Sequence, residues 1–188
     1  MTRLPANAAL IIIDVQQAFD DPEWGRRNNP QAEANIAALL AAWRQSARPL
    51  FHIHHRAARL ASLFHPDRAG FAVKPEATPL PGEPVIYKEV NSAFIGTDLE
   101  QRLRAAGIGD VVIVGITTDH CVSTTTRMAG NFGFTTSIVS DATATFERKG
   151  PDGKHYSAEQ MHDTALASLN GEFAAVVTTA QMLDQAGR

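Results

Sequence analysis

Short, continuous apolar runs alternate along this chain with stretches in which apolar residues recur every three or four positions. The run Ala9–Ile13 (ALIII) contains no polar residue, which is typical of a strand covered on both faces. From Pro30 to Ala47 one apolar stripe has the spacing of an amphipathic helix. Its members are Ile36, Leu39, Leu40 and Trp43. Because strands and helices alternate in this way, the sequence predicts an α/β fold with a parallel sheet.

The same patterns predict six strands and five helices. The strands fall at residues 9–13, 50–54, 85–87, 110–115, 135–140 and 174–177. The helices fall at residues 30–47, 97–106, 121–131 and 157–169, with a last helix closing the chain. Two of these helices begin with the spacing of a capping box, Thr97 with Glu100 and Ser157 with Gln160. We therefore expect a three-layer α/β/α sandwich around a six-stranded, mostly parallel, Rossmann-like sheet.

A chain of 188 residues with 44% hydrophobic residues is the size of a single domain, here residues 1–188. The segment 55–84 carries five prolines, two glycines and little periodicity. Loops of this length in compact domains are usually functional, so we expect 55–84 to be a lid or pocket loop.

Charge and composition exclude several classes of function. Seventeen Lys and Arg residues against twenty Asp and Glu residues leave a net charge of −3, which does not favour binding to nucleic acid. No secretory leader or membrane span is recognisable, so we expect a cytoplasmic protein that does not bind membranes. No G-x-G-x-x-G motif follows the first strand, which argues against a dinucleotide-binding fold.

Functional groups in doubly wound folds gather beyond the carboxyl ends of the strands. The residues that this rule selects are Asp14, His54, His55, Lys88, residues 115–121 and Asp141.

Cys121 is the one cysteine of the chain, which excludes an internal disulfide and a zinc site built on several thiolates. It stands where the predicted helix 121–131 begins. The helix dipole there should lower the thiol pKa below its usual ~8.5, and free backbone N–H groups offer an oxyanion site. We therefore expect Cys121 to react with iodoacetamide well below that pH. The alternative is a small buried hydrophobic residue, as most free cysteines are.

Asp14 and Lys88 each end another predicted strand. An Asp directly after four apolar residues is partly desolvated, which should raise its pKa and allow it to accept a thiol proton. Taken singly, Asp14 could instead cap a turn and Lys88 could be a surface lysine. Taken together with Cys121, they are three chemically complementary groups that can converge at one edge of the sheet.

Several stretches of this chain resemble the isochorismatase-like cysteine hydrolases, the superfamily that includes N-carbamoylsarcosine amidase and the nicotinamidases. The matching stretches are Asp14–Gln16, Lys88–Phe94, Gly115–Val122, Gly133–Phe134 with Val139–Asp141, and Leu166–Phe173. The resemblance implies a catalytic triad of Asp14, Lys88 and Cys121. It also implies a cis peptide between Ile116 and Thr117, with the backbone N–H groups of Thr117 and Cys121 as the oxyanion hole.

The resemblance further implies a small-molecule substrate, no cofactor, and a homodimer or homotetramer. The residues expected to bind substrate are Gln16, Phe19, His55, Phe94, Thr118 and His120. Trp24 and Phe64 are interpreted as core or subunit contacts, and Asn91 as structural.

The implied reaction is a double displacement on the C–N bond of an amide, carbamoyl or ureido compound. Asp14 takes the thiol proton, Cys121 attacks the carbonyl carbon, and water hydrolyses the thioester. Members of the superfamily that cleave a vinyl ether do not need the cysteine, so the fold alone leaves that reaction open. A metal-assisted nicotinamidase is the other alternative among enzymes. A catalytically inactive binding protein is the alternative from another class.

The histidines His52, His54 and His55 suggest a metal site. On a strand, His52 and His54 share one face and His55 points to the other. Nicotinamidases of the superfamily hold a metal with a D-x-H…H arrangement, and the run HIHHRA has no Asp between its histidines. We therefore expect no metal and a pocket-lining role for His55.

Overall fold

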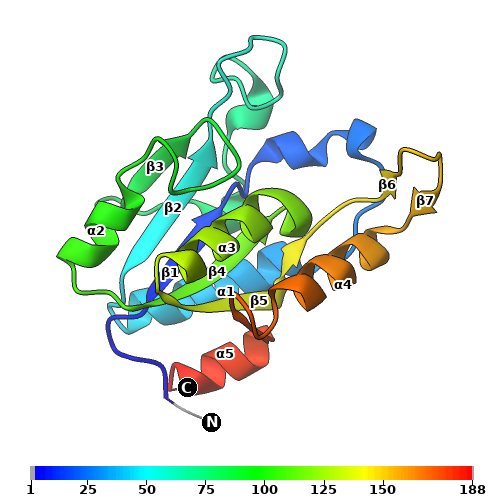
Figure 1. Ribbon diagram of the computed structural model, residues 1–188. Coiled ribbons are helices and arrows are strands. Elements are labelled where there is room, and N and C mark those ends of the chain that lie inside the picture. Colours follow the sequence, from blue (N-terminus) through cyan, green and yellow to red (C-terminus); the bar gives the residue numbers. More distant parts are fainter. Residues whose placement is uncertain (1–2, 188) are drawn as a thin grey trace.

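The computed structural model describes residues 3–187, and its centre is a six-stranded sheet (Figure 1). The strand order is β3-β2-β1-β4-β5-β8, and each neighbouring pair is parallel. The strands are β1 (Ala9–Ile13), β2 (Leu50–His55), β3 (Val85–Lys88), β4 (Asp110–Ile116), β5 (Thr135–Ala144) and β8 (Ala175–Val177). The predicted α/β fold with a six-stranded parallel sheet is confirmed.

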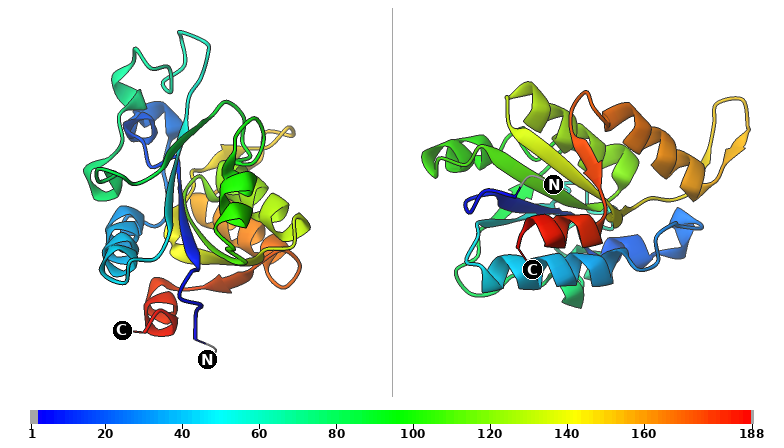
Figure 2. Two further views of the ribbon diagram at one scale, coloured as in Figure 1. Left: turned by 90° about the vertical axis from the view of Figure 1, so that its left-hand side faces the viewer. Right: turned by 90° about the horizontal axis from the view of Figure 1, so that it is seen from below.

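Helices cover both faces of the sheet (Figure 2). On one face lie α1 (Ala32–Gln45) and α5 (Thr179–Gln185), and on the other α2 (Leu99–Ala105), α3 (Ser123–Asn131) and α4 (Ala158–Leu169). Successive side chains of a strand point to opposite faces. Leu10 of β1 therefore packs in the cluster that contains α1, whereas Ile11 packs in the cluster below α2 and α4. Because both faces are covered, β1 has no position open to a polar residue.

Two features differ from the prediction for the second half of the chain. Strand β5 continues to Ala144 instead of ending at residue 140, with a shift in its register against β4 between Ile113 and Gly115. After it the chain forms an antiparallel hairpin of β6 (Arg148–Lys149) and β7 (His155–Tyr156), which projects from the body beside α4 (Figure 1). Both strands of the hairpin are too short to produce a hydrophobic period.

The two predicted capping boxes have different outcomes. In α4 the Ser157 and Gln160 side chains cap each other's backbone N–H groups, as predicted. In α2 the prediction is wrong, because the helix begins at Leu99 after Asp98 and the Thr97 hydroxyl donates backward to the Ala93 carbonyl.

The long segment after β2 is docked against the chain that follows β1. A bridge joins Val73 to Gln16, and the Lys74 N–H donates to the Val15 carbonyl at 3.0 Å. At Gly70, an added Cβ would lie 2.7 Å from the Leu63 carbonyl oxygen and 3.0 Å from the Ala18 Cα. This close approach requires a glycine. The segment is therefore packed firmly against the body of the protein, and its expected function as a lid stays a prediction.

In the part of the chain that the structure describes, no helix combines the length and the apolar character needed to cross a membrane.

Candidate active site

The three side chains selected from predicted strand ends meet at one edge of the sheet. Asp14 follows β1 with a positive φ of 51°, a turn conformation that Asp tolerates better than most residues, and its side chain is 1% exposed. Lys88 ends β3 with a fully buried side chain, and its Nζ lies 2.7 Å from Asp14 Oδ2. The same Nζ lies 3.3 Å from the Sγ of Cys121. A carboxylate, an ammonium and a thiol thus share one buried space.

The turn that carries Cys121 fits tightly beside β1. Gly115 has a φ of +128°, and an added Cβ would lie 2.0 Å from the carbonyl oxygen of Ile13. The peptide bond between Ile116 and Thr117 is cis. Residues Thr118–Val122 then form a π-helical turn that leads into α3. Cys121 therefore lies in the turn that precedes α3, two residues before its first residue Ser123.

The Lys88 ammonium has more acceptors than it has N–H groups. Besides Asp14 and Cys121, the Val90 carbonyl oxygen lies 3.1 Å away and Nδ1 of His55 lies 3.2 Å away. An ammonium carries three N–H groups, so it serves three of these four acceptors at a time. In the resting state the thiol can keep its own proton, while Lys88 serves the carboxylate, the carbonyl and the imidazole.

Burial controls the protonation of the pair. Desolvation raises the pKa of Asp14, as predicted, although the Lys88 charge opposes the effect. Desolvation, assisted by the Asp14 charge, raises the pKa of the Cys121 thiol to about 12. The prediction of a lowered thiol pKa is therefore wrong. The residue is only 9% exposed, and the cost of burying a thiolate exceeds the effects of Lys88 and the helix that follows.

The trio opens into a cavity of about 150 Å³. Its lining residues are Asp14, Phe19, Trp24, His55, Phe64, Asn91, Thr117, His120 and Cys121. The Phe19 ring contacts the rings of Trp24 and Phe64 at centroid distances of 5.2 and 5.1 Å, so one wall is aromatic. His120 is half exposed. Phe19, His55 and His120 therefore line the cavity, and their expected contact with substrate stays a prediction.

Three residues predicted to bind substrate do not line the cavity. Gln16 is fully buried and uses its side-chain amide on the backbone of His55. Phe94 packs in the core, with its ring 5.3 Å from that of Phe132. The Thr118 hydroxyl is hydrogen-bonded to Nδ1 of His162 at 2.9 Å. Each of these side chains is committed to protein contacts.

The lining also includes three residues that the sequence interpretation had placed elsewhere. Trp24 and Phe64 pack against a small core cluster, as expected, but they also form the aromatic wall of the cavity. Asn91 faces Cys121 with its Oδ1 3.7 Å from Sγ. A signal for the first two exists in the sequence. Large aromatic residues inside polar, Pro-rich segments are candidates for a binding wall, because no regular element there offers a core for them.

The donor set could attract a metal only in competition with Lys88. Among residues 3–187, Asp14, His55 and Cys121 bring ligand atoms within 4.8 Å of one another. The Lys88 Nζ lies within 3.3 Å of all three side chains and already supplies the positive charge. His52 instead pairs with Glu83 at 2.8 Å on the other face of β2. The three histidines therefore do not converge on one site.

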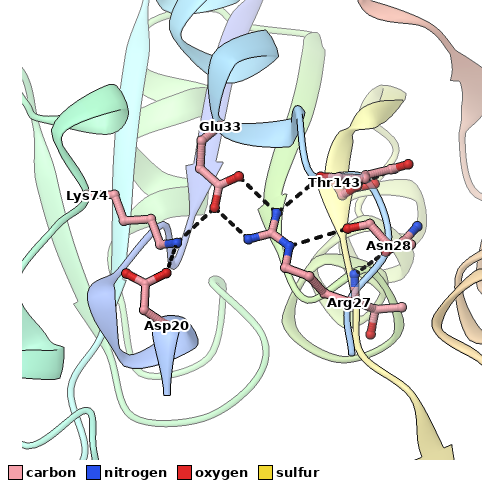
Figure 3. A network of polar contacts seen from close by, with 8 residues as sticks. Asp20, Arg27, Asn28, Glu33, Lys74 and Thr143 are labelled. Atoms are coloured by element: carbon pink, nitrogen blue, oxygen red, sulfur yellow. Dashed lines mark hydrogen bonds and ion pairs between the residues drawn. The ribbon is translucent and has the colours of Figure 1, made fainter. Parts of the chain in front are cut away.

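A network of charges joins Asp20, Arg27, Glu33 and Lys74 (Figure 3). Glu33, in the first turn of α1, accepts from Arg27 Nη1 at 2.7 Å and from Lys74 Nζ at 2.9 Å. Lys74 also pairs with Asp20, the residue after Phe19. Although burial alone would raise it, hydrogen bonds from Arg27 and Lys74 lower the pKa of Glu33 to about 2. Glu33 thus joins three separate segments that carry or flank the wall.

Comparison with known proteins gives matches over nearly the whole chain. A family model described as the isochorismatase domain matches residues 8–181. The uncharacterized isochorismatase family protein YrdC of Bacillus subtilis is 49% identical over 176 residues, which cover 94% of each chain. The crystal structure of an isochorismatase-family protein from Chromobacterium violaceum has a TM-score of 0.97 and 44% identity, covering 100% of this chain and 97% of that chain.

Two more distant relatives have named activities. Streptothricin hydrolase of Streptomyces noursei is 29% identical over 88% of this chain and 57% of its own length. The ureidoacrylate amidohydrolase RutB of Methylobacterium radiotolerans is 26% identical over 90% of this chain and 75% of its own length.

Proposed function

The chain belongs to the isochorismatase family of hydrolases, and we propose that it hydrolyses the C–N bond of a small, neutral amide-like compound with Cys121 as the nucleophile. The observation that carries this proposal is the position of the Lys88 Nζ, 2.7 Å from Asp14 Oδ2 and 3.3 Å from Cys121 Sγ. One ammonium in contact with both groups can stabilise the negative charge on either of them. A proton can therefore pass between thiol and carboxylate without leaving an unpaired charge in the site.

The first half of the reaction forms a thioester. As the substrate carbonyl enters, the thiol proton passes to Asp14, and the Lys88 N–H groups turn from the carboxylate to the thiolate. Sγ then attacks the carbonyl carbon, and the oxygen takes the negative charge near the backbone N–H groups of Thr117 and Cys121. The C–N bond breaks, and Asp14 returns the proton to the leaving nitrogen.

The second half regenerates the enzyme. A water molecule enters the space of the departed amine and gives a proton to Asp14 as its oxygen attacks the thioester carbon. The C–S bond breaks, the acid product leaves, and the proton returns from Asp14 to Sγ. The raised pKa of Asp14 suits this exchange, because a base poised nearer neutrality both accepts and returns a proton readily.

The cavity supports a small substrate without a net charge. Its volume is about 150 Å³, and among residues 3–187 its lining includes no lysine or arginine. The neighbouring Lys88 is already paired with Asp14. A substrate with carboxylates would leave those charges against Phe19, Trp24 and Phe64, a costly arrangement without a counter-ion. This favours an amide over a charged vinyl ether.

Ammonia release from a panel of small amides, carbamoyl and ureido compounds tests the proposal. The wild-type protein should release ammonia from at least one compound, and Cys121→Ala should lower that rate by at least about 10³-fold. Ser123→Ala is the matched control, because Ser123 lies two residues further in α3 and does not line the cavity. Turnover that survives in Cys121→Ala would rule out the thioester route.

A further inference from the structure

The imidazole of His55 is held in one tautomer by its contact with Lys88, and we infer that its Nε2–H selects substrates by donating a hydrogen bond to a second acceptor atom beside the scissile amide. The inference on the substrate rests on the proposed amide hydrolysis. The inference on the tautomer does not.

The tautomer follows from the contact between His55 and Lys88. Nδ1 of His55 lies 3.2 Å from the Lys88 Nζ. A lysine ammonium only donates hydrogen bonds, so Nδ1 must offer a lone pair. A neutral imidazole with a lone pair on Nδ1 carries its proton on Nε2. Burial, followed by the Lys88 charge, lowers the pKa of His55 to about 4, which keeps the ring neutral in the physiological range.

His55 is held on three sides, by its backbone between β1 and β3 and by its ring against Phe64. The His55 N–H donates to Oε1 of Gln16 at 2.8 Å, and the His55 carbonyl accepts from Nε2 of the same side chain at 3.1 Å. On the other side of β2, His55 is in register with Lys88 of β3. The Phe64 ring meets the imidazole edge to face at a centroid distance of 5.2 Å. A donor held this firmly is preorganised for recognition.

Nε2 is the one polar atom of this ring that the protein leaves open. Across residues 3–187 it takes part in no hydrogen bond, and it is not one of the buried polar atoms without a partner. It is therefore accessible, and His55 lines the cavity. The imidazole stands at the aromatic wall, against the Phe64 ring, so a substrate acceptor placed there meets the Nε2–H of His55 as its donor. This predicts a small neutral amide with a carbonyl, ether or ring-nitrogen acceptor in addition to its scissile carbonyl.

The tautomer can be measured without any substrate. In ¹⁵N-labelled protein, long-range ¹H–¹⁵N correlation spectra distinguish a protonated nitrogen from one with a lone pair in each histidine ring. The His55 signals are those that disappear in His55→Gln. From pH 6 to 8 we expect a proton on Nε2 and a lone pair on Nδ1. A proton on Nδ1, or a charged ring, would overturn the inference whatever the enzyme hydrolyses.

Selection is tested with four amides of one shape: benzamide and its three ring-nitrogen isomers, picolinamide, nicotinamide and isonicotinamide. Binding is measured by NMR titration with Cys121→Ala, so that no turnover is needed. At least one pyridine isomer should bind about tenfold more tightly than benzamide. This preference should vanish in Cys121→Ala/His55→Phe. It should return in part in Cys121→Ala/His55→Gln, because Gln can accept from Lys88 and still donate.

Equal binding of all four amides, or binding of none of them, contradicts selection by His55. Failure of the amidase proposal looks different. In that case the isomer preference and the tautomer would both be observed, but the protein with its thiol intact would release no ammonia from any amide.

Discussion

The side chains of Asp14 and Lys88 form an ion pair with 2.7 Å between Oδ2 and Nζ, although neither is more than 1% exposed. Removing one partner of such a pair normally leaves an uncompensated buried charge, which is strongly destabilising. Here the thiol of Cys121 lies beside both partners and can ionise in place of the carboxylate. A thiolate at Cys121 can therefore replace the Asp14 carboxylate as the negative partner of Lys88.

Substitution of Asp14 by Asn should accelerate alkylation of Cys121 while it abolishes turnover. The Asp14 charge raises the thiol pKa and the Lys88 charge lowers it. Without the carboxylate, the thiolate becomes the counter-ion of Lys88, and the rate with iodoacetamide at pH 7.5 should rise by about tenfold or more. Since Cys121 is the one cysteine, mass spectrometry of the intact protein follows the reaction directly.

Substitution of Lys88 by Met should have the opposite effect on the thiol. Loss of the ammonium raises the thiol pKa further, so alkylation should become slower than in the wild type, which is itself slower than a free cysteine. Circular dichroism checks that the variant is folded. If both variants change the alkylation rate in the same direction, the assignment of opposing charges at Cys121 is wrong.

Glu33→Gln should lower stability at neutral pH but not in acid. The folded-state pKa of Glu33 is lowered from 4.5 to about 2, so its contribution is complete above pH 4.5 and is lost as the pH falls toward 2. With allowance for screening by solvent, we expect a loss of about 1–2 kcal/mol in the free energy of unfolding at pH 7. Urea unfolding from pH 7 to pH 3 should show the wild-type and variant values converging.

Glu76→Gln is the control for this charge, because Glu76 is exposed and forms no ion pair within residues 3–187. It should change stability by less than about 0.5 kcal/mol at any pH in that range. If the free energies of unfolding of Glu33→Gln and the wild type differed by the same amount from pH 7 to pH 3, the ionised carboxylate would not be what stabilises the network.

Gly115→Ala should destabilise the whole fold. A methyl group at this position would lie 2.0 Å from the backbone oxygen of Ile13, and the φ of +128° disfavours any side chain. We expect a loss of at least about 3 kcal/mol, or roughly 6 to 12 °C in Tm. Gly109→Ala is the matched control, because an added Cβ meets nothing within 4 Å there. Equal Tm values for the two variants would contradict the close packing of β1 and β4.

Phe64→Ala should shift substrate preference toward bulkier amides. Phe64 forms part of the cavity wall, so its truncation enlarges the cavity and should lower KM for branched substrates relative to small ones. The control is Phe94→Leu in the core, which should cost roughly 1–3 kcal/mol of stability and leave the preference unchanged. A change of preference in Phe94→Leu would place that residue at the substrate after all.

The chemistry of this site was more predictable from the sequence than its shape. Asp14 and Lys88 directly follow apolar runs, and the ends of parallel strands share one edge of the sheet, so their convergence with Cys121 follows from the strand pattern. The environment of the thiol does not follow from that pattern. Its pKa depends on how completely the turn is buried, which is a property of tertiary packing and not of position along a helix.

The walls of the cavity could not be derived in the same way. Trp24 and Phe64 lie in segments without periodicity, and their meeting with Phe19 depends on the contacts of Gly70 and Lys74 with the chain after β1. In contrast, Phe94 and Thr118 were assigned to the substrate by resemblance, and in the fold their side chains contact protein. Proximity in sequence to a catalytic residue does not determine on which side of the backbone a neighbour lies.

Beyond Ile13, the last residue of β1, the side chain of Gln16 takes over the hydrogen bonding to the neighbouring strand β2. Its amide both accepts from and donates to the backbone of His55, and it also donates to the Phe71 carbonyl at 3.0 Å. A primary amide has the donor and acceptor of a peptide unit, so the Gln16 side chain makes the hydrogen bonds that a neighbouring strand would otherwise make with His55. The backbone of His55, the last residue of β2, thereby keeps hydrogen-bond partners beyond the end of β1. A carboxylate at position 16 has no donor, so a glutamate there would lose the hydrogen bonds to the carbonyls of both His55 and Phe71.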